Sequence, residues 1–281
     1  MSYVVEAVAS SRSRAFDEGY AALAAEFAPR GELERREVIA RWLDEGERPT
    51  PAALPLRRSY QMLVARDEHG ALAGVRDCHV VLDDRNRVAV VYLAHALVLP
   101  PFRRTGLAAL LRSEPIAIAR RFLEDAVADA STIDLLLAAE MEPPSLDDEA
   151  SIIRLVAYGK EGFAAIAPAV LPYCQPDFRD LDQLGAGKAR AIPLLAIVRF
   201  LGHEGAASLP ARLARAFVTH LYAVFGTHVR ADHLAELEAR TLGVLDAFAS
   251  GEIRDVPLLP LPRTIDDAAA VTPLSLPQEL R

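Results

Sequence analysis

Hydrophobic and polar positions along this chain follow two patterns, one typical of strands and one typical of helices. Short apolar runs rich in β-branched residues and bounded by polar turns predict β-strands. These runs occupy residues 3–9, 60–66, 72–82, 88–98, 133–139 and 192–201. Apolar residues spaced three and four apart predict helices over residues 14–27, 33–43, 106–128, 149–160, 210–225 and 231–248. The interleaving of the two patterns indicates an α/β chain of the α+β type.

The connections between the predicted strands indicate how these strands pair. Polar turns at residues 67–70 and 83–86 join three successive strand runs. Connections this short favour antiparallel hairpins. The run at 133–139 is apolar almost throughout, as expected of a strand buried on both faces. We therefore predict a mixed, mostly antiparallel central sheet flanked by helices.

Proline-containing and polar segments mark the expected interruptions. Residues 49–55 form a Pro-rich connector and residues 142–148 a polar loop. Pro115 lacks a backbone donor, so we expect the helix over 106–128 to break or kink there. The tail, 256–281, holds five prolines without periodicity, which predicts an extended, surface-packed or partly disordered segment. We place one domain at residues 1–202 and a helical extension with a Pro-rich tail at 203–281.

Composition narrows the function classes. The 281 residues are 52% hydrophobic, enough to bury a sizeable core, and the formal net charge is −8. An acidic chain is not expected to bind nucleic acid and is compatible with a basic substrate such as an amine. Cys78 and Cys174 lie far apart, so neither a disulfide framework nor a cysteine zinc site is expected.

The compartment is predicted from what the sequence does not contain. No apolar run reaches the roughly 18 to 20 residues that a membrane span needs. The first residues show no basic leader. We therefore expect a cytoplasmic protein that does not associate with a membrane.

The strongest local signal lies where the strand at 88–98 meets the following helix. This segment reads Val98-Leu99-Pro100-Pro101-Phe102-Arg103-Arg104-Thr105-Gly106-Leu107-Ala108. A strand, a short turn, an Arg-x-x-Gly-x-Ala loop and a helix bring several backbone N–H groups to the positive end of a helix dipole. Such a loop binds an anion, here a phosphate or pyrophosphate. It matches neither the dinucleotide nor the nucleoside-triphosphate glycine loop.

The same segment resembles the acyl-CoA signature of the GCN5-related N-acetyltransferase (GNAT) superfamily. That signature is Val-x-Pro-x-x-Arg-x-x-Gly-x-Gly/Ala. The matching positions in this chain are Val98, Pro100, Arg103, Gly106 and Ala108. The resemblance implies a GNAT-like acyl-CoA-binding fold.

A second motif supports this resemblance. The superfamily often has a Tyr four residues before a Gly-Phe pair that follows the next strand and helix. Here these residues are Tyr158, Gly162 and Phe163, at a distance that suits one strand and its flanking helices. The resemblance covers about residues 1–202 and not the remainder.

The resemblance implies acetyl-CoA as the co-substrate. Amides of the loop would hold its pyrophosphate, on residues Arg103, Arg104, Thr105, Gly106, Leu107 and Ala108. Gly106 would allow the phosphates close to the backbone. The strand end at Leu97 and Val98 would bind the pantetheine arm and polarise the thioester carbonyl. No metal is expected, because His228 and His233 are five residues apart and do not share a helix face.

The implied reaction is an N-acyl transfer in which an amine attacks the thioester directly. Tyr158 matches the position of the family's general acid. A phenol with a pKa near 10 can protonate a thiolate whose conjugate acid has a pKa near 8.5, slightly uphill. The base is left open between His95, Glu140 and a chain of waters, which several family members use.

One departure from the family affects the acceptor side. At the end of the strand predicted at 133–139, where many members carry an Asn, this chain reads Ala139-Glu140-Met141-Glu142-Pro143-Pro144. Substrate contacts of the family are therefore not carried over to this position. The proline pair is a candidate for reshaping the acceptor pocket.

Three functions remain as alternatives at this point. The leading one is acetyl transfer to a small-molecule, protein or peptide amine. The second is a non-catalytic acyl-CoA sensor or interaction module. The third is transfer of a longer acyl chain, as in homoserine-lactone synthases. Residues 203–281 are candidates for lining the acceptor site, forming a homodimer surface or capping the sheet edge.

Overall fold

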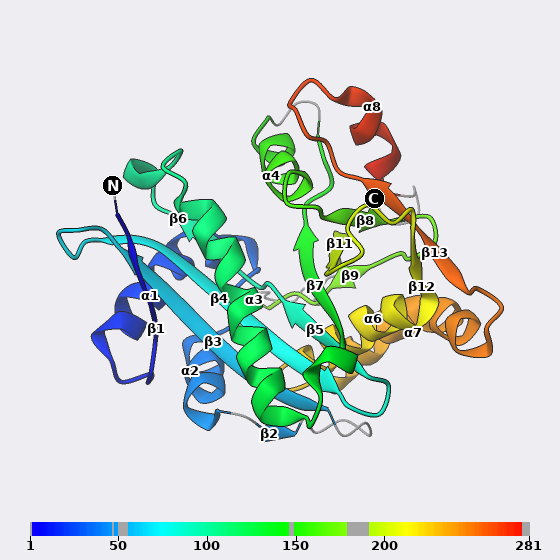
Figure 1. The fold of residues 1–281 in the computed structure, drawn as a ribbon, viewed down its shortest axis with the longest axis horizontal. Coiled ribbons are helices and arrows are strands. Elements are labelled where there is room, and N and C mark those ends of the chain that lie inside the picture. The colour runs from blue at the N-terminus through cyan, green and yellow to red at the C-terminus, as the bar shows by residue number, and fades with distance from the viewer. Residues whose placement is uncertain (1, 47, 50–55, 146–148, 179–190, 277–281) are drawn as a thin grey trace. The chain divides into compact units, whose positions relative to one another are not determined.

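The computed structural model describes residues 2–46, 48–49, 56–145, 149–178 and 191–276 (Figure 1). They form two compact units. As far as its residues are described, one unit takes in 1–133 and 177–189 and the other 134–176 and 190–281. None of the helices in these ranges has the length and apolar character of a membrane span. The domain boundary expected at residue 202 stays a prediction.

The first unit is built on an antiparallel sheet with the strand order β1-β3-β4-β5. A short strand, β2, pairs with β3, and β6 pairs with β4. The strands are β1 (Val4–Ala7), β2 (Arg48–Pro49), β3 (Arg57–Arg66), β4 (Leu72–Asp83), β5 (Val88–Tyr92) and β6 (Ala96–Val98). The helices are α1 (Arg14–Phe27), α2 (Arg36–Glu45) and α3 (Leu107–Ala126), with 3-10 turns at Ala28–Arg30, Pro100–Phe102 and Ala130–Thr132. Both predicted hairpins are confirmed.

Helices cover both faces of this sheet (Figure 1). On the α1 face, a Cβ added to Gly19 would lie 3.2 Å from Met62 Sδ on β3. On the α3 face, a Cβ added to Gly74 would lie 3.0 Å from a methyl carbon of Leu111. The helix expected to break or kink at Pro115 does not break, because α3 is continuous from Leu107 to Ala126 with Pro115 buried.

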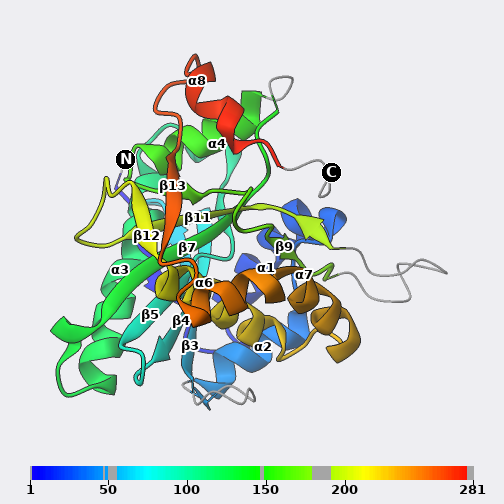
Figure 2. The ribbon, with the colours of Figure 1, turned by 90° about the vertical axis from the view of Figure 1, so that its right-hand side faces the viewer.

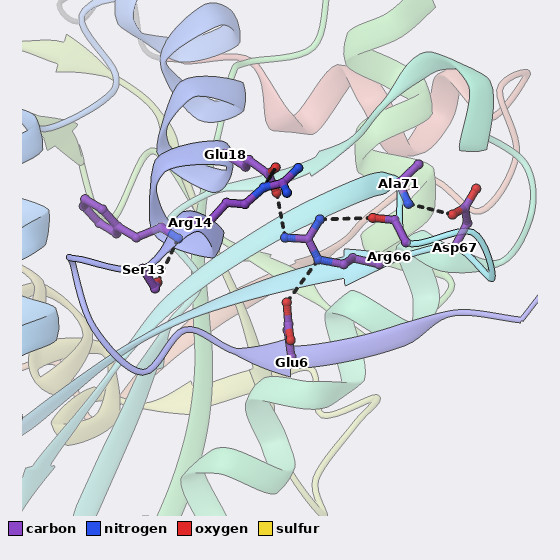
Figure 3. A network of polar contacts seen from close by, with 9 residues as sticks. Glu6, Ser13, Arg14, Glu18, Arg66, Asp67 and Ala71 are labelled. Carbon is purple, nitrogen blue, oxygen red and sulfur yellow. Dashed lines mark hydrogen bonds and ion pairs between the residues drawn. The ribbon is translucent and has the colours of Figure 1, made fainter.

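An arginine at the end of β3 fastens the edge of the sheet (Figure 3). Arg66 donates to Glu6 on β1 at 3.1 Å, to Glu18 on α1 at 2.7 Å and to the Gly70 carbonyl at 3.2 Å. Hydrogen bonds from Arg66, and next from the α1 arginine, lower the pKa of Glu18. The Ser13 side chain caps the start of α1. One guanidinium thus ties the edge strand, a helix and the β3–β4 turn together.

The strand expected at 88–98 is interrupted. β4 pairs with β5 through His79 and Tyr92, and with β6 through Arg76 and Ala96. Three steps along β4 therefore correspond to four steps along its partner, which is a bulge of one residue at 93–95. The continuous apolar run did not reveal it, since register is set by the partner strand.

The second unit has an antiparallel sheet with the order β7-β11-β8-β13-β12. Its strands are β7 (Asp134–Met141), β8 (Ala164–Ile166), β11 (Leu195–Phe200), β12 (Ser208–Pro210) and β13 (Asp255–Pro260), beside a two-stranded pair of β9 (Cys174–Gln175) and β10 (Ile192–Pro193). Its helices are α4 (Glu149–Gly159), α6 (Ala211–Phe225), α7 (Ala231–Ser250) and α8 (Ala268–Val271). The mostly antiparallel sheet with flanking helices, including the additional C-terminal helices, is confirmed (Figure 2).

Two expectations for this unit need correction. The strand predicted at 192–201 is divided into β10 and β11. The tail from 256 onward is extended at its start, as one of the predicted alternatives had it, but it forms the strand β13, which pairs with β8 and with β12. Pro257 lacks an N–H but its carbonyl still accepts from Ala167 at 3.0 Å, so proline does not exclude this strand. The parts of the predicted connector, loop and tail at 50–55, 146–148 and 277–281 lie outside the described residues.

Candidate functional site

The loop between β6 and α3 has the backbone shape of an anion site. After the 3-10 turn at Pro100–Phe102, Arg104 (φ 65°) and Gly106 (φ 86°) are both left-handed. The left-handed conformation is uncommon for a residue other than glycine. Successive N–H groups around such residues form concavities that bind anions. α3 starts immediately afterwards, at Leu107.

The N–H groups of this loop have no protein acceptor. Among the described residues, none accepts a hydrogen bond from the backbone N–H groups of residues 104–108. The Gly106 carbonyl already accepts from Ala109 at 3.1 Å and from Leu110 at 3.3 Å. Leu107 is buried, whereas the other residues from 103 to 108 are exposed. These donors are therefore directed to the surface at the positive end of α3.

Side chains hold the loop in this shape. The Tyr3 hydroxyl donates to Thr105 Oγ1 at 2.8 Å, and Thr105 Oγ1 donates to the Phe102 carbonyl at 2.5 Å. The Tyr3 and Phe102 rings meet edge to face, with centroids 6.3 Å apart. Arg103 Nε donates to the Val98 carbonyl at 3.2 Å, so this side chain folds back on β6. Tyr3 belongs to no recognisable motif, so its role in supporting the loop could not be predicted from the sequence.

Along β6, the backbone N–H and C=O groups of successive residues point alternately toward β4 and away from it. The His95 carbonyl accepts from Asp77 on β4, and the Leu99 N–H donates to Ala73 on β4. Backbone groups alternate in direction along a strand, so those of Leu97, which lies between His95 and Leu99, also point toward β4. The backbone groups of Ala96 and Val98 point away from β4. Of the two predicted thioester contacts, only Val98 therefore has backbone groups that point away from β4, as Ala96 does; their contact with a ligand stays a prediction.

His95, a candidate base, lies in a buried ion pair. Its Nδ1 lies 3.1 Å from both Asp77 carboxylate oxygens, and its Nε2 donates to the Glu32 carbonyl at 2.8 Å. Burial opposes charge on the ring, but Asp77 outweighs it and raises the pKa of His95 to about 9. Both ring nitrogens then act as donors, so the ring has no lone pair for an incoming proton. The base role stays an untested prediction that this environment disfavours.

Tyr158, the candidate acid, belongs to a hydrogen-bonded turn at the end of α4. Its carbonyl accepts from Glu161 at 3.0 Å and from Phe163 at 3.2 Å. Gly162 takes a left-handed φ of 84°, as at many helix ends. The Tyr158 ring, half-buried, meets the Phe163 ring edge to face at 5.0 Å. The spacing of the second motif is therefore also what this helix terminus requires.

A glycine beside Tyr158 gives a test of this packing. A Cβ on Gly159 would lie 2.5 Å from the Pro262 carbonyl oxygen. We expect Gly159→Ala to lower the free energy of unfolding by about 1–3 kcal/mol, as overpacking does. The control is Gly243→Ala in α7, where a Cβ meets nothing within 4 Å and alanine adds about 0.5–1 kcal/mol. Equal thermal melting of both variants would contradict the close approach.

Glu140, the other candidate base, lies near the end of β7 in an aromatic setting. Its Oε1 accepts from the Tyr173 hydroxyl at 2.6 Å. The buried Tyr173 ring lies 5.4 Å from Phe217 and 5.9 Å from Tyr222. Burial first, then Cys174 and Glu140, raise the pKa of Tyr222. Sequence reasoning missed both tyrosines, since neither belongs to a motif.

The predicted site residues fall in two groups. The first unit brings together the loop, Val98, Leu97 and His95. The second unit carries Tyr158 and Glu140. Within the described ranges, no three His, Cys, Asp or Glu side chains are grouped closely enough to hold a metal ion.

Comparisons with known proteins give structural matches alone. No family model matches the sequence, and no curated protein does. The structural neighbours are acetyltransferases. A Bacillus subtilis acetyltransferase in complex with CoA matches with a TM-score of 0.40 and 16% identity over 71% of this chain and 99% of its own. A GNAT-family acetyltransferase from Staphylococcus aureus matches with a TM-score of 0.39 and 13% identity over 70% and 99%.

A third match is part of a larger protein. It is the GCN5-related glucosamine N-acetyltransferase region of a fungal multi-domain β-N-acetylglucosaminidase, at 18% identity and a TM-score of 0.39. It covers 58% of this chain and spans only 17% of the fungal chain. At these scores and identities the likeness carries no conclusion about activity or substrate.

Proposed function

We propose that this protein is an acyl-CoA-dependent N-acyltransferase that transfers an acetyl group from acetyl-CoA to an amine. The observation that carries the proposal is the loop before α3, with two left-handed residues and a row of N–H groups that no described residue accepts. A pyrophosphate accepts several such hydrogen bonds and is stabilised at a helix N-terminus. The motif resemblance selects the pyrophosphate of acyl-CoA among such anions.

The donor side of the reaction falls to the first unit. Residues 103–108 hold the pyrophosphate, and the absence of a side chain at Gly106 lets the phosphates reach the backbone. The exposed Arg104 adds positive charge to the same loop. Backbone groups of Val98 and Ala96 bind the pantetheine arm and polarise the thioester carbonyl as charge develops on its oxygen.

Tyr158 and Glu140 take the acid and base roles in this proposal. The amine nitrogen attacks the thioester carbon, the C–S bond breaks, and the Tyr158 hydroxyl gives its proton to the departing thiolate. Glu140 takes a proton from the amine, directly or through water. Glu140 suits the base role better than His95, because an ionised carboxylate has several acceptor lone pairs, of which the Tyr173 hydroxyl uses one at Oε1, whereas both His95 nitrogens donate.

A ligand series tests the donor side of this proposal. Acetyl-CoA, succinyl-CoA, longer acyl-CoAs and free CoA are added in turn and the melting temperature is recorded. Ligand at about 100 times its dissociation constant adds about 2.7 kcal/mol of stability. We expect acetyl-CoA and free CoA to raise the melting temperature. No shift with any of them would contradict the proposal.

CoA release in the presence of amines tests the transfer itself. The panel holds polyamines, aminoglycosides and peptide N-termini, and we expect release with at least one class. Tyr158→Phe is expected to lower kcat with little change in the acetyl-CoA KM, because a lost acid acts in the transition state. Binding without release across the panel would favour the sensor function.

A further inference from the structure

We propose that Asp77 and His95 form a buried clamp that sets the position of the strand edge offered to the acyl thioester. In this role His95 is a positioning residue and not the base. The inference rests on the proposed function for its catalytic consequence. Its structural part, the fixing of β6, stands on the geometry of the first unit alone.

The clamp lies at the bulge between β5 and β6. The Asp77 N–H donates to the His95 carbonyl at 3.1 Å, as in an ordinary antiparallel pair. The return bond differs, because the His95 N–H donates to the Asp77 carboxylate at 2.7 Å. A side-chain oxygen thus takes the place of a strand carbonyl at the point where one extra residue is accommodated.

The His95 ring ties a third segment to the same point. Its Nδ1 side is held by both Asp77 oxygens, and its Nε2 by the Glu32 carbonyl in the connection between α1 and α2. The Tyr60 hydroxyl on β3 donates to Asp77 Oδ2 at 3.0 Å. The Phe27 ring covers the imidazole at 5.0 Å. The strands β3 and β4, the bulge before β6 and the α1–α2 connection therefore meet at one carboxylate–imidazole pair.

The pair is sealed from solvent. Asp77, His95 and Tyr60 are 1%, 6% and 2% exposed. A buried carboxylate that lost its imidazolium would be left uncompensated, so neither partner leaves easily. Neither His95 nitrogen is left to accept a proton from a substrate, because one faces Asp77 and the other donates to the Glu32 carbonyl.

The clamp affects catalysis because His95 lies next to β6 in the chain. His95 directly precedes Ala96–Val98, the strand β6. A slip of one residue at the bulge would turn the backbone groups of Val98 toward β4 and those of Leu97 away. Misplacement by about 1 Å costs about 100-fold in the rate of a well-oriented reaction. A clamp that fixes this register therefore acts on the chemical step without touching the substrate.

The main test uses Asp77→Asn, which keeps an acceptor oxygen for the His95 N–H but removes the charge. We expect kcat to fall about 100-fold. The dissociation constant of free CoA should rise by less than about tenfold, because the pyrophosphate loop is separate from the bulge and only the pantetheine contacts of β6 are displaced. Tyr60→Phe, which removes one hydrogen bond and leaves the pair, is expected to lower kcat less than tenfold. Unchanged kcat in Asp77→Asn, or loss of CoA binding together with kcat, would overturn the proposal.

His95→Gln separates positioning from base catalysis. In the clamp role kcat falls, but the acid limb of the dependence of kcat/KM on pH stays as in the wild type. Disappearance of the acid limb of that profile would assign His95 as the base and overturn the clamp. This variant also serves if Asp77→Asn fails to fold.

Amide hydrogen exchange tests whether the clamp fixes β6 without relying on an activity measurement. Faster exchange at the amides of residues 95–99 in Asp77→Asn, with α3 amides unchanged, supports the clamp even if the wild-type protein releases no CoA. In that outcome the proposed function fails and the clamp stands. Unchanged exchange at residues 95–99 would overturn the clamp itself.

Discussion

A Gly106→Glu protein will fold and lose its affinity for acyl-CoA by about 100-fold, or about 2.7 kcal/mol. A Cβ at Gly106 would meet nothing within 4 Å, so the fold is not opposed by a clash. The left-handed φ costs about 1–2 kcal/mol for a residue with a side chain. The added carboxylate competes for the same N–H groups and repels the phosphates. The dissociation constant of CoA, measured by calorimetry, gives the effect.

Two control variants separate charge from backbone strain. Gly106→Ala carries the same strain and adds a small side chain without the charge, so we expect it to lose less affinity for CoA than Gly106→Glu does. Gly70→Glu places a glutamate at another open, left-handed glycine, φ 80°, in the β3–β4 turn. We expect no change in CoA affinity there. Normal CoA binding by Gly106→Glu would remove the loop from the donor site.

Raising the pH through the range from 6.5 to about 9 will remove about 3 kcal/mol of stability that His95 contributes. Its pKa in the folded protein is about 9, above the ordinary value of 6.5. Burial lowers that pKa, but the charge of Asp77, the hydrogen bond to its carboxylate, the charge of Glu34 and the hydrogen bond to the Glu32 carbonyl together raise it by more. A raised pKa means stability that is fully present below pH 6.5 and lost as the pH passes about 9.

The measurement compares wild type with His95→Gln at several pH values. The chain has one tryptophan, Trp42, which is 2% exposed on α2 of the first unit. Its fluorescence during denaturant unfolding therefore reports on the unit that contains His95. We expect the difference between the two proteins to shrink as the pH rises. A difference that is constant over this range would show that His95 is not charged in the folded protein.

The fold could be predicted where the signal is local. α1 begins and ends at the residues that the apolar spacing indicates, because Ser13 caps it and the periodicity is regular. The bulge at 93–95 could not, since its cause is the partner strand β4. β13 could not either, because its prolines break any periodicity and its extended form depends on β8 and β12.

The same distinction divides the site. The anion loop is contiguous, so its residues could be identified from order and spacing alone. Its support comes from Tyr3, 102 positions away from Thr105. Asp77 and His95 are 18 positions apart, and Tyr173 and Glu140 are 33. Sequence spacing carries no information on such pairs unless a known motif includes them.

The strand order of the second unit determines when this protein can complete its fold during synthesis. β8 is made at residues 164–166, yet one of its neighbours, β13, is made only at 255–260. Until then that edge of β8 stays unpaired, open to pairing with other chains. Pairings this distant along the chain form slowly. β8, which directly follows the Tyr158 motif, therefore has both of its partner strands only after β13 is made, and a nascent chain without β13 exposes this edge to aggregation.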